Sequence, residues 1–272
     1  MVVKSPAKKK RRIDLRKTLF VLPNMITLSS IFCGFLSIRE ASAATTSTQF
    51  AGAALLLVFA MFFDMLDGRV ARMTKTQSAF GLQIDSLADV VSFGAAPAIL
   101  VYQWSLVRLG GMGLFVSFAF LACGAIRLAR FNVLAMGEGG EPTKPSKYIV
   151  GLPIPGAAGV LLSVILADHA AGTSLGSLRF AWGVLALTVA LSFFMVSTIQ
   201  FRSFKELRMN APTVLLVLFA IGSSLVIATQ SKPAFVLVWL LGVYVLLGVF
   251  ETLVNIARRL FAPKRDSLPP AG

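Results

Sequence analysis

Four aspartates at helical spacing are the residues of this chain whose types could do chemistry together. Asp64 and Asp67 are three residues apart, and Asp85 and Asp89 are four residues apart. Residues at these separations share one face of a helix, so two carboxylate pairs on adjacent helices could meet. Only 12 of the 272 residues are acidic, so four of them within this stretch need a specific explanation.

The expected chemistry is that of a cation site that binds a diphosphate. Carboxylates at the edge of hydrocarbon repel one another and cost about 2.5 to 3.5 kcal/mol each to bury, which predicts a positive partner. Without His or Cys nearby, oxygen ligands favour Mg²⁺, Mn²⁺ or Ca²⁺. Gly68, Ala71 and Gly81 leave space on the same helix faces, and Arg72 could grip phosphate oxygens. The alternative is that the carboxylates are ordinary helix-end charges and the glycines serve close helix packing.

The elements that must position these residues are membrane helices. The chain is 56% hydrophobic and 14% charged, with a mean hydropathy of +0.80. We therefore predict an all-α, polytopic bundle in one membrane domain (19–260), between a basic leader (1–18) and a tail (261–272). Apolar runs of about 20 residues predict eight transmembrane helices: 19–38, 50–66, 86–106, 112–134, 153–167, 180–199, 212–228 and 235–257.

Positive charge predicts the orientation of these helices. With both termini in the cytoplasm, all but four of the 26 Lys and Arg residues fall on the cytoplasmic side; the four are Arg39, Arg108, Arg179 and Lys232. This distribution follows the positive-inside rule and places the aspartates at the cytoplasmic face. The net charge of +14 then requires no nucleic acid, because a basic leader beside a bilayer meets anionic lipid. A bacterial inner membrane would suit such a chain.

The cysteines and the histidine have no partners at metal-ligand spacing. Cys33 and Cys123 lie within apolar runs, so we expect them to pack rather than react. His169 follows the fifth predicted span, where we expect a solvated loop residue. None of the three receives a functional role.

The acidic stretch is similar to the defining motif of the CDP-alcohol phosphatidyltransferases. The matching string is Asp67-Gly68-x-x-Ala71-Arg72, eight residues, then Gly81-x-x-x-Asp85-x-x-x-Asp89, and Asp64 fits the longer form of the motif. In that family an alcohol attacks a CDP-linked lipid and displaces CMP, with two divalent ions held by the motif aspartates.

The resemblance implies a role for each motif residue. Asp64, Asp67, Asp85 and Asp89 would bind the metal ions, and Asp89 would also act as the base that takes the proton from the attacking hydroxyl. The residues expected to contact the CDP-lipid are Asn24, Gly68, Ala71, Arg72, Ser78 and Gly81. Asn24 could instead bond to a neighbouring helix.

Three further segments resemble integral-membrane phosphatidylserine synthases. They are "LPNMITLSSIFCGFLSI", "DSLADVVSFGAAPA", and "AIRLARFN" ahead of "GLPIPGAA". This resemblance implies transfer of the phosphatidyl group from CDP-diacylglycerol to L-serine by direct displacement. Transfer to glycerol 3-phosphate or an inositol phosphate is an alternative acceptor reaction. In a different class, a divalent-cation transporter would be expected to place its carboxylates near the bilayer midplane.

Two arginines and an asparagine near the end of the fourth predicted span are candidates for binding the acceptor. Arg127 and Arg130 are three residues apart, and Asn132 follows closely. Such a group could neutralise the carboxylate of serine. The alternative is that the arginines anchor the helix among lipid head groups. We also expect a homodimer, from small-residue helix faces and the habit of the family.

Overall fold

The computed structural model describes residues 15–74, 78–135, 148–172 and 178–202, together with Ser223, 235–243 and Val245. The elements up to residue 202 are α1 (Leu15–Ala43), α2 (Ser47–Thr74), α3 (Ala79–Asp89), the π-helical turn η1 (Val90–Ala95), α4 (Ala96–Trp104), the 3₁₀ turn η2 (Leu106–Leu109), α5 (Gly111–Ala135), β1 (Tyr148–Val150), α6 (Ile154–Ala171), α7 (Leu178–Val196) and β2 (Gln200–Arg202).

Six helical segments are long and apolar enough to cross a membrane. They confirm the first six predicted spans, with α3, η1 and α4 together forming the third. α1 begins at Leu15, so the first helix extends into the predicted leader. The predicted span 212–228 lies outside the described residues except for Ser223, and 235–257 is described as helix over 235–243.

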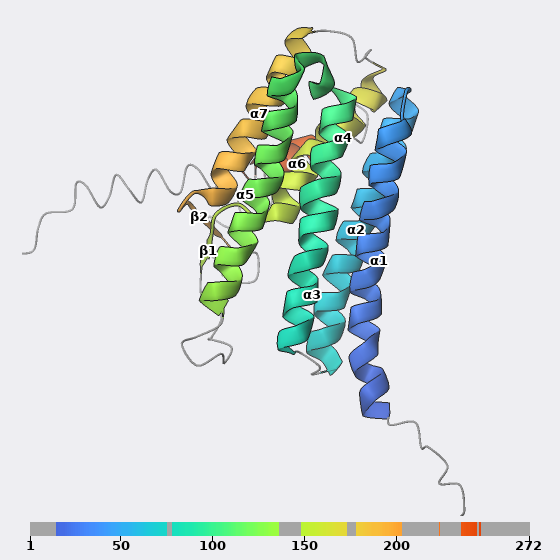
Figure 1. The fold of residues 1–272 in the computed structure, drawn as a ribbon, viewed down its shortest axis with the longest axis vertical. Coiled ribbons are helices and arrows are strands. Elements are labelled where there is room, and N and C mark those ends of the chain that lie inside the picture. Colours follow the sequence, from blue (N-terminus) through green and yellow to red (C-terminus); the bar gives the residue numbers. More distant parts are fainter. Residues whose placement is uncertain are drawn as a thin grey trace, which may run out of the picture.

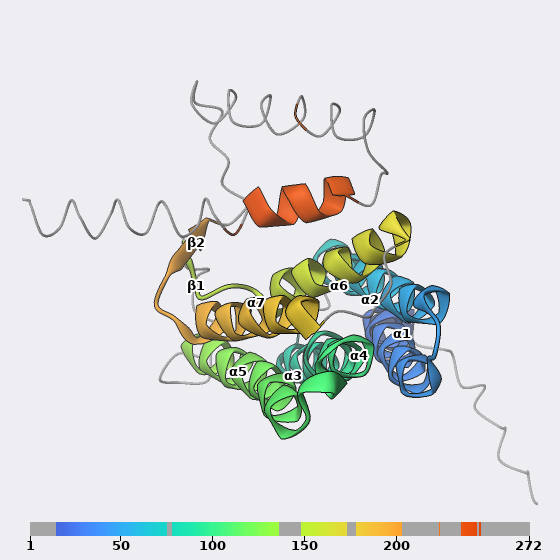
Figure 2. The ribbon, with the colours of Figure 1, turned by 90° about the horizontal axis from the view of Figure 1, so that it is seen from above.

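Successive spans run in opposite directions and pack in two rows. α3–α4 lies between α1 and α5, while α6 lies between α2 and α7 (Figure 1; Figure 2). The start of α1, the end of α2, the start of α3 and the end of α5 therefore meet at one end of the bundle. The four motif aspartates lie on α2 and α3 toward this end of the bundle.

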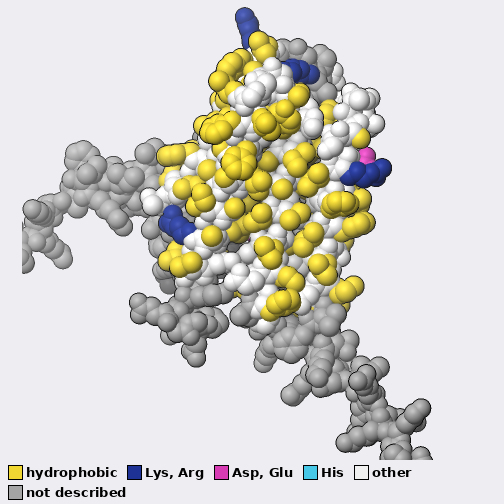
Figure 3. Space-filling view, viewed as in Figure 1, with side chains coloured by type: hydrophobic (Ala, Val, Ile, Leu, Met, Phe, Trp, Pro, Cys, Tyr) yellow, Lys and Arg dark blue, Asp and Glu magenta, His cyan; other side chains and the backbone are white. Residues whose placement is uncertain are grey.

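The outer face of the bundle is apolar, as lipid requires. Figure 3 shows hydrophobic side chains spread over one face, with charged side chains only near its margins. Large side chains such as Phe32, Phe35 and Phe115 are more than half exposed. The α1–α2 interface instead uses small residues such as Ala53 and Ala60, which let backbones approach closely.

Serine hydroxyls join α1 to α2 along this close interface. Ser37 Oγ donates to the carbonyl of Ala53 at 2.8 Å, and Ser30 Oγ donates to the carbonyl of Ala60 at 3.1 Å. Such bonds add directional contacts between helices in a medium where apolar burial provides little driving force. They fix α2 relative to α1 on the approach to the acidic end.

A π-helical turn interrupts the third span immediately after Asp89. In η1 the amide of Ala96 donates to the carbonyl of Val91, five residues earlier. Ser92 within this turn donates from Oγ to the carbonyl of Ser30 at 3.0 Å, which fastens the turn to α1. Single π turns within α-helices are often found at functional sites. The hydropathy pattern predicts the span but not this turn.

The helices confirm the prediction of an all-α fold, and the chain adds one short β ladder that was not predicted. β1 and β2 form a two-stranded antiparallel ladder that pairs Tyr148 with Arg202. The predicted helix 180–199 accordingly ends at Val196. Gly151 has a φ of +80° and its amide donates to the carbonyl of Ile199 at 2.8 Å, so the chain turns there into the start of α6.

The two cysteines lie within helices of the bundle, and the histidine lies near the end of α6. Cys33 is buried and Cys123 partly buried, and neither forms a disulfide. His169 is exposed, as expected, but lies in the last turn of α6 rather than in a loop, because α6 continues to Ala171. Its Nδ1 is 2.9 Å from Ser47 Oγ at the start of α2.

Candidate active site

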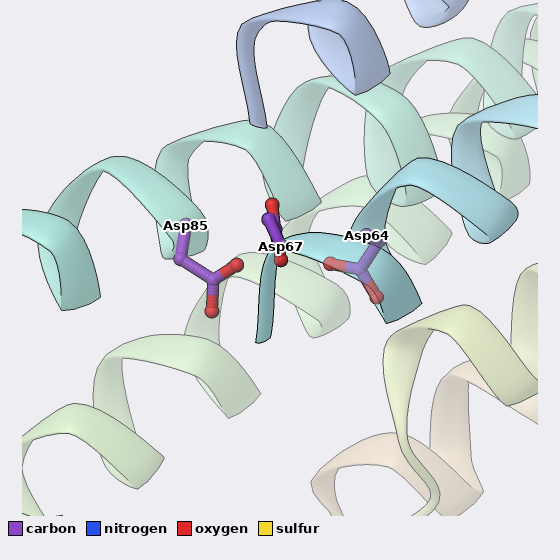
Figure 4. A group of neighbouring side chains, drawn as sticks. All are labelled: Asp64, Asp67 and Asp85. Atoms are coloured by element: carbon purple, nitrogen blue, oxygen red, sulfur yellow. The ribbon is translucent and has the colours of Figure 1, made fainter. Parts of the chain in front are cut away.

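Three of the four motif aspartates form one cluster. α2 presents Asp64 and Asp67, and α3 presents Asp85, with one carboxylate oxygen from each lying within 4.8 Å of the others. Figure 4 shows Asp67 between Asp64 and Asp85. Among the described residues, no Lys or Arg lies within ion-pair distance of these three carboxylates. Three oxygen donors at this separation fit a hard divalent cation.

Asp89 adjoins this cluster without belonging to it. It ends α3, directly before the π turn, and its carboxylate interacts electrostatically with Asp64 and Asp85. Arg127 of α5 is the cationic neighbour of Asp89. Asp89 Oδ1 is buried and has no hydrogen-bond partner among the described residues. A buried carboxylate oxygen without a partner is costly, so this atom is suited to a ligand that brings a cation or a proton donor.

Thr27 is a contact of the cluster that the sequence analysis missed. Its Oγ1 donates to Asp67 Oδ2 at 2.6 Å, and both residues are buried. Asn24, predicted to contact the CDP-lipid, lies three residues earlier on α1 and is partly buried. The signal that could have identified Thr27 is this i, i+3 relation to Asn24, which places both on one helix face.

Most of the residues predicted to contact the CDP-lipid lie at the end of α2 or the start of α3, beside the cluster. Ser78 caps α3, because its Oγ accepts from the amide of Gly81 at 3.0 Å. A Cβ on Gly68 would meet the guanidinium of Arg72 at 3.6 Å, so Arg72 covers the small face of α2. Arg72 is exposed, and Ala71 is partly buried beside it. The end of α2 thus combines an accessible cation with an uncrowded backbone.

The two arginines of α5 have different surroundings. Arg127 is partly buried and interacts electrostatically with Asp89. Arg130 is exposed, and its Nη1 donates to the carbonyl of Val196, the last residue of α7, at 3.4 Å. The structure therefore brings Arg127 to the carboxylates and directs Arg130 toward α7.

Asn132 is tied to the helix that carries Asp85. Its Nδ2 lies 2.9 Å from Ser86 Oγ, and Ser86 Oγ lies 3.1 Å from Asn132 Oδ1. Ser86 is the residue after Asp85, so this pair joins α5 to α3 beside the cluster. The sequence analysis did not single out Ser86, although it stands between two motif positions.

Comparison with protein families shows where this chain belongs. The family model for CDP-alcohol phosphatidyltransferase matches residues 20–196. The chain belongs to the CDP-alcohol phosphatidyltransferase family. The match runs from α1 to the end of α7 and includes the four motif aspartates.

Relatives within this family carry similar names. The chain is 37% identical to the CDP-diacylglycerol–serine O-phosphatidyltransferase of Helicobacter pylori, over 92% of this chain and 98% of the relative. It is 33% identical to the protein of the same name from Bacillus subtilis, over 68% of this chain and 92% of the relative. It is also 35% identical to the archaetidylserine synthase of Methanothermobacter thermautotrophicus, over 64% and 71% of the two chains.

Proposed function

We propose that this protein transfers the phosphatidyl group of CDP-diacylglycerol to L-serine, giving phosphatidylserine and CMP. The observation that carries the proposal is the meeting of Asp64, Asp67 and Asp85 where α2 and α3 converge, within a family motif for this transfer. The choice of serine is supported by the names of relatives that match this chain over most of its length.

The carboxylates are suited to hold two divalent ions, Mg²⁺ or Mn²⁺, with Ca²⁺ as a further possibility. Such ions, when bound, neutralise the charge of the diphosphate during displacement. Asp64, Asp67 and Asp85 supply the clustered oxygens, and the partnerless Oδ1 of Asp89 is a further donor. Arg72, over the small face of α2 at Gly68, would contact phosphate oxygens. Ala71 and Gly81 would border the same diphosphate. Asn24 and Ser78 would complete the CDP-lipid contacts.

Asp89 would take the proton from the serine hydroxyl. The hydroxyl oxygen then forms a bond to the lipid-bearing phosphorus, the bond from that phosphorus to CMP breaks, and CMP leaves with the electron pair. The electrostatic interactions of Asp89 with Asp64, Asp85 and Arg127 support this role. A base within hydrogen-bond reach of the attacking hydroxyl is the geometric requirement of the step.

The acceptor would bind on the α5 side. Arg127, which interacts electrostatically with Asp89, would pair with the serine carboxylate, and Asn132, held by Ser86, would contact its polar groups. Arg130 would extend this basic surface from its position against α7.

The site would face the cytoplasm of a bacterial inner membrane. The helix ends around the site carry Arg69, Arg72, Arg127 and Arg130, as the positive-inside rule favours. Asp67 and Asp85 lie in the third of their spans nearest this end of the bundle rather than midway, which disfavours a divalent-cation transporter. The homodimer remains a prediction.

The acceptor is tested by measuring CMP release from CDP-diacylglycerol with one acceptor at a time. Purified protein in detergent should release CMP with L-serine, and phosphatidylserine should appear in equal amount. Glycerol 3-phosphate and inositol phosphate serve as the comparison acceptors. Faster CMP release with either of them would show that the enzyme uses that acceptor rather than serine.

A further inference from the structure

Thr27 of α1 reaches across to the carboxylate of Asp67 on α2. The 2.6 Å separation between Thr27 Oγ1 and Asp67 Oδ2 is short, as expected when the acceptor is charged. Each residue is 4% exposed. Thr27 Oγ1 also lies 3.1 Å from the carbonyl of Pro23, but this neutral acceptor is farther away. The hydroxyl is therefore committed to Asp67 by both distance and charge.

This bond restricts the middle member of the acidic cluster. Asp67 lies between Asp64 and Asp85 (Figure 4). The terminal torsion of an aspartate side chain is broad, so a carboxylate without a partner samples many orientations. When one oxygen is held by a hydroxyl on another helix, the direction of the second oxygen is also restricted.

We infer that Thr27 is a positioning residue of the cation site, whose hydroxyl keeps the Asp67 carboxylate in one orientation toward Asp64 and Asp85. The inference rests on the proposed function, because it requires that these carboxylates bind a cation. Residues that orient metal ligands from outside commonly change metal affinity 10- to 100-fold when replaced.

Two other hydroxyls of α1 help to separate positioning from simple helix packing. Ser30 and Ser37 also bond from α1 to α2, but each donates to a backbone carbonyl. Of these three contacts, that of Thr27 ends on a carboxylate of the cluster. Ser37 is fully buried and bonds to Ala53 near the opposite end of the helix pair, so it provides a matched control.

The test measures Mn²⁺ binding directly, without substrate or turnover. Free Mn²⁺ is followed by its electron paramagnetic resonance signal during titration into purified, detergent-solubilised protein. Thr27→Val, which keeps the shape but removes the hydroxyl, should weaken Mn²⁺ binding about 10-fold or more. Thr27→Ser keeps the hydroxyl and should bind Mn²⁺ nearly as the wild type does. Ser37→Ala should leave the affinity unchanged.

The outcomes separate this inference from the proposed function. Wild-type affinity in Thr27→Val, or an equal loss in Ser37→Ala, would overturn the positioning role. Failure of the wild-type protein to bind Mn²⁺ would overturn the proposed metal site itself. Thr27→Ala provides a second variant without the hydroxyl, and the melting temperature of each metal-free variant distinguishes weakened binding from loss of the fold.

Discussion

The two ends of the helical bundle treat charged side chains differently. At the α1–α2 turn, Arg39 Nη1 lies 2.8 Å from Glu40 Oε1, and the two side chains are 70% and 41% exposed. At the opposite end, Asp67 is clustered with Asp64 and Asp85. Asp67 is 4% exposed and accepts a hydrogen bond from the hydroxyl of Thr27. One end neutralises its charges between sequence neighbours in water, whereas the other brings like charges together.

This difference indicates which charges serve stability and which serve chemistry. An exposed ion pair contributes about 0 to 1 kcal/mol, so the Arg39–Glu40 pair can be lost at little cost. Carboxylates gathered at a partly buried site are unfavourable until a cation joins them. The acidic end therefore depends on a ligand, and the opposite end does not.

Removal of divalent cations should have the largest effect. Excess EDTA should abolish CMP release, and added Mg²⁺ or Mn²⁺ should restore it, because the clustered carboxylates would lack their neutralising partner. The measurement is CMP release before and after metal is returned to the same sample. Full turnover in excess chelator, with the absence of metal confirmed by elemental analysis, would show that the acidic end does not require a cation.

Asp85→Asn should weaken metal binding and CDP-lipid binding together. The change removes one charged oxygen from the three-carboxylate cluster. We expect kcat/KM to fall by roughly 10³-fold, or about 4 kcal/mol. Binding of CDP-diacylglycerol and CMP release are measured on the same preparation. Normal CDP-lipid affinity in this variant would contradict the assignment of Asp85 as a metal ligand.

Asp89→Asn should affect the chemical step more than binding. If Asp89 removes the hydroxyl proton, kcat should fall by roughly 10² to 10⁴ while most affinity for the CDP-lipid remains. Both variants must stay monodisperse in detergent for the comparison to hold. A loss of CDP-lipid binding as complete as in Asp85→Asn would make Asp89 another metal ligand, and the base would have to be water or substrate.

Arg127→Ala and Arg130→Ala should differ although the residues are one helical turn apart. Arg127 interacts electrostatically with Asp89, so its loss should raise the KM for serine by roughly 10- to 100-fold, as expected for a lost charge-assisted hydrogen bond. Arg130 contacts the end of α7, and its replacement should have a smaller effect. The KM for CDP-diacylglycerol is the internal control. Equal effects on both substrates would indicate instead that Arg127 anchors α5 among lipid head groups.

The smallest effect is expected at the opposite end of the bundle. Glu40→Gln removes the exposed ion pair with Arg39, and we expect a change in the free energy of unfolding of less than about 1 kcal/mol. CMP release should be unchanged. Thermal unfolding and CMP release are measured together, and a large loss of either would show that this end is not independent of the site.

The sequence predicts the spans better than it predicts their interruptions. Apolar length identifies six of the eight predicted helices in the described residues because lipid imposes that length. The strands β1 and β2 were not predicted, since each has three residues and their pairing joins positions about 50 residues apart. The π turn after Asp89 leaves no trace in hydropathy.

Within the site, spacing predicts which carboxylates can meet but not what surrounds them. The i, i+3 relation of Asp64 and Asp67 places both toward α3, where Asp85 lies. The contact from Thr27 depends on how α1 packs against α2, and the spacing of residues within either helix does not predict that packing. The divergence of Arg127 from Arg130 likewise depends on where α7 ends. Their catalytic and binding roles remain predictions.

The π turn at Val90–Ala95 separates membrane insertion from catalysis. One residue corresponds to about 100° of rotation in an α-helix. The π turn accommodates one extra residue without this rotation, whereas deleting one residue from α4, which has no wide turn to compensate, would rotate Asp85 and Asp89 by about that angle relative to the rest of α4. The span would keep its apolar length and still enter the membrane, which fractionation would detect, while CMP release would be lost. Hydropathy thus determines that the segment crosses the bilayer, whereas the residue count of its α-helical part determines whether its carboxylates meet those of α2.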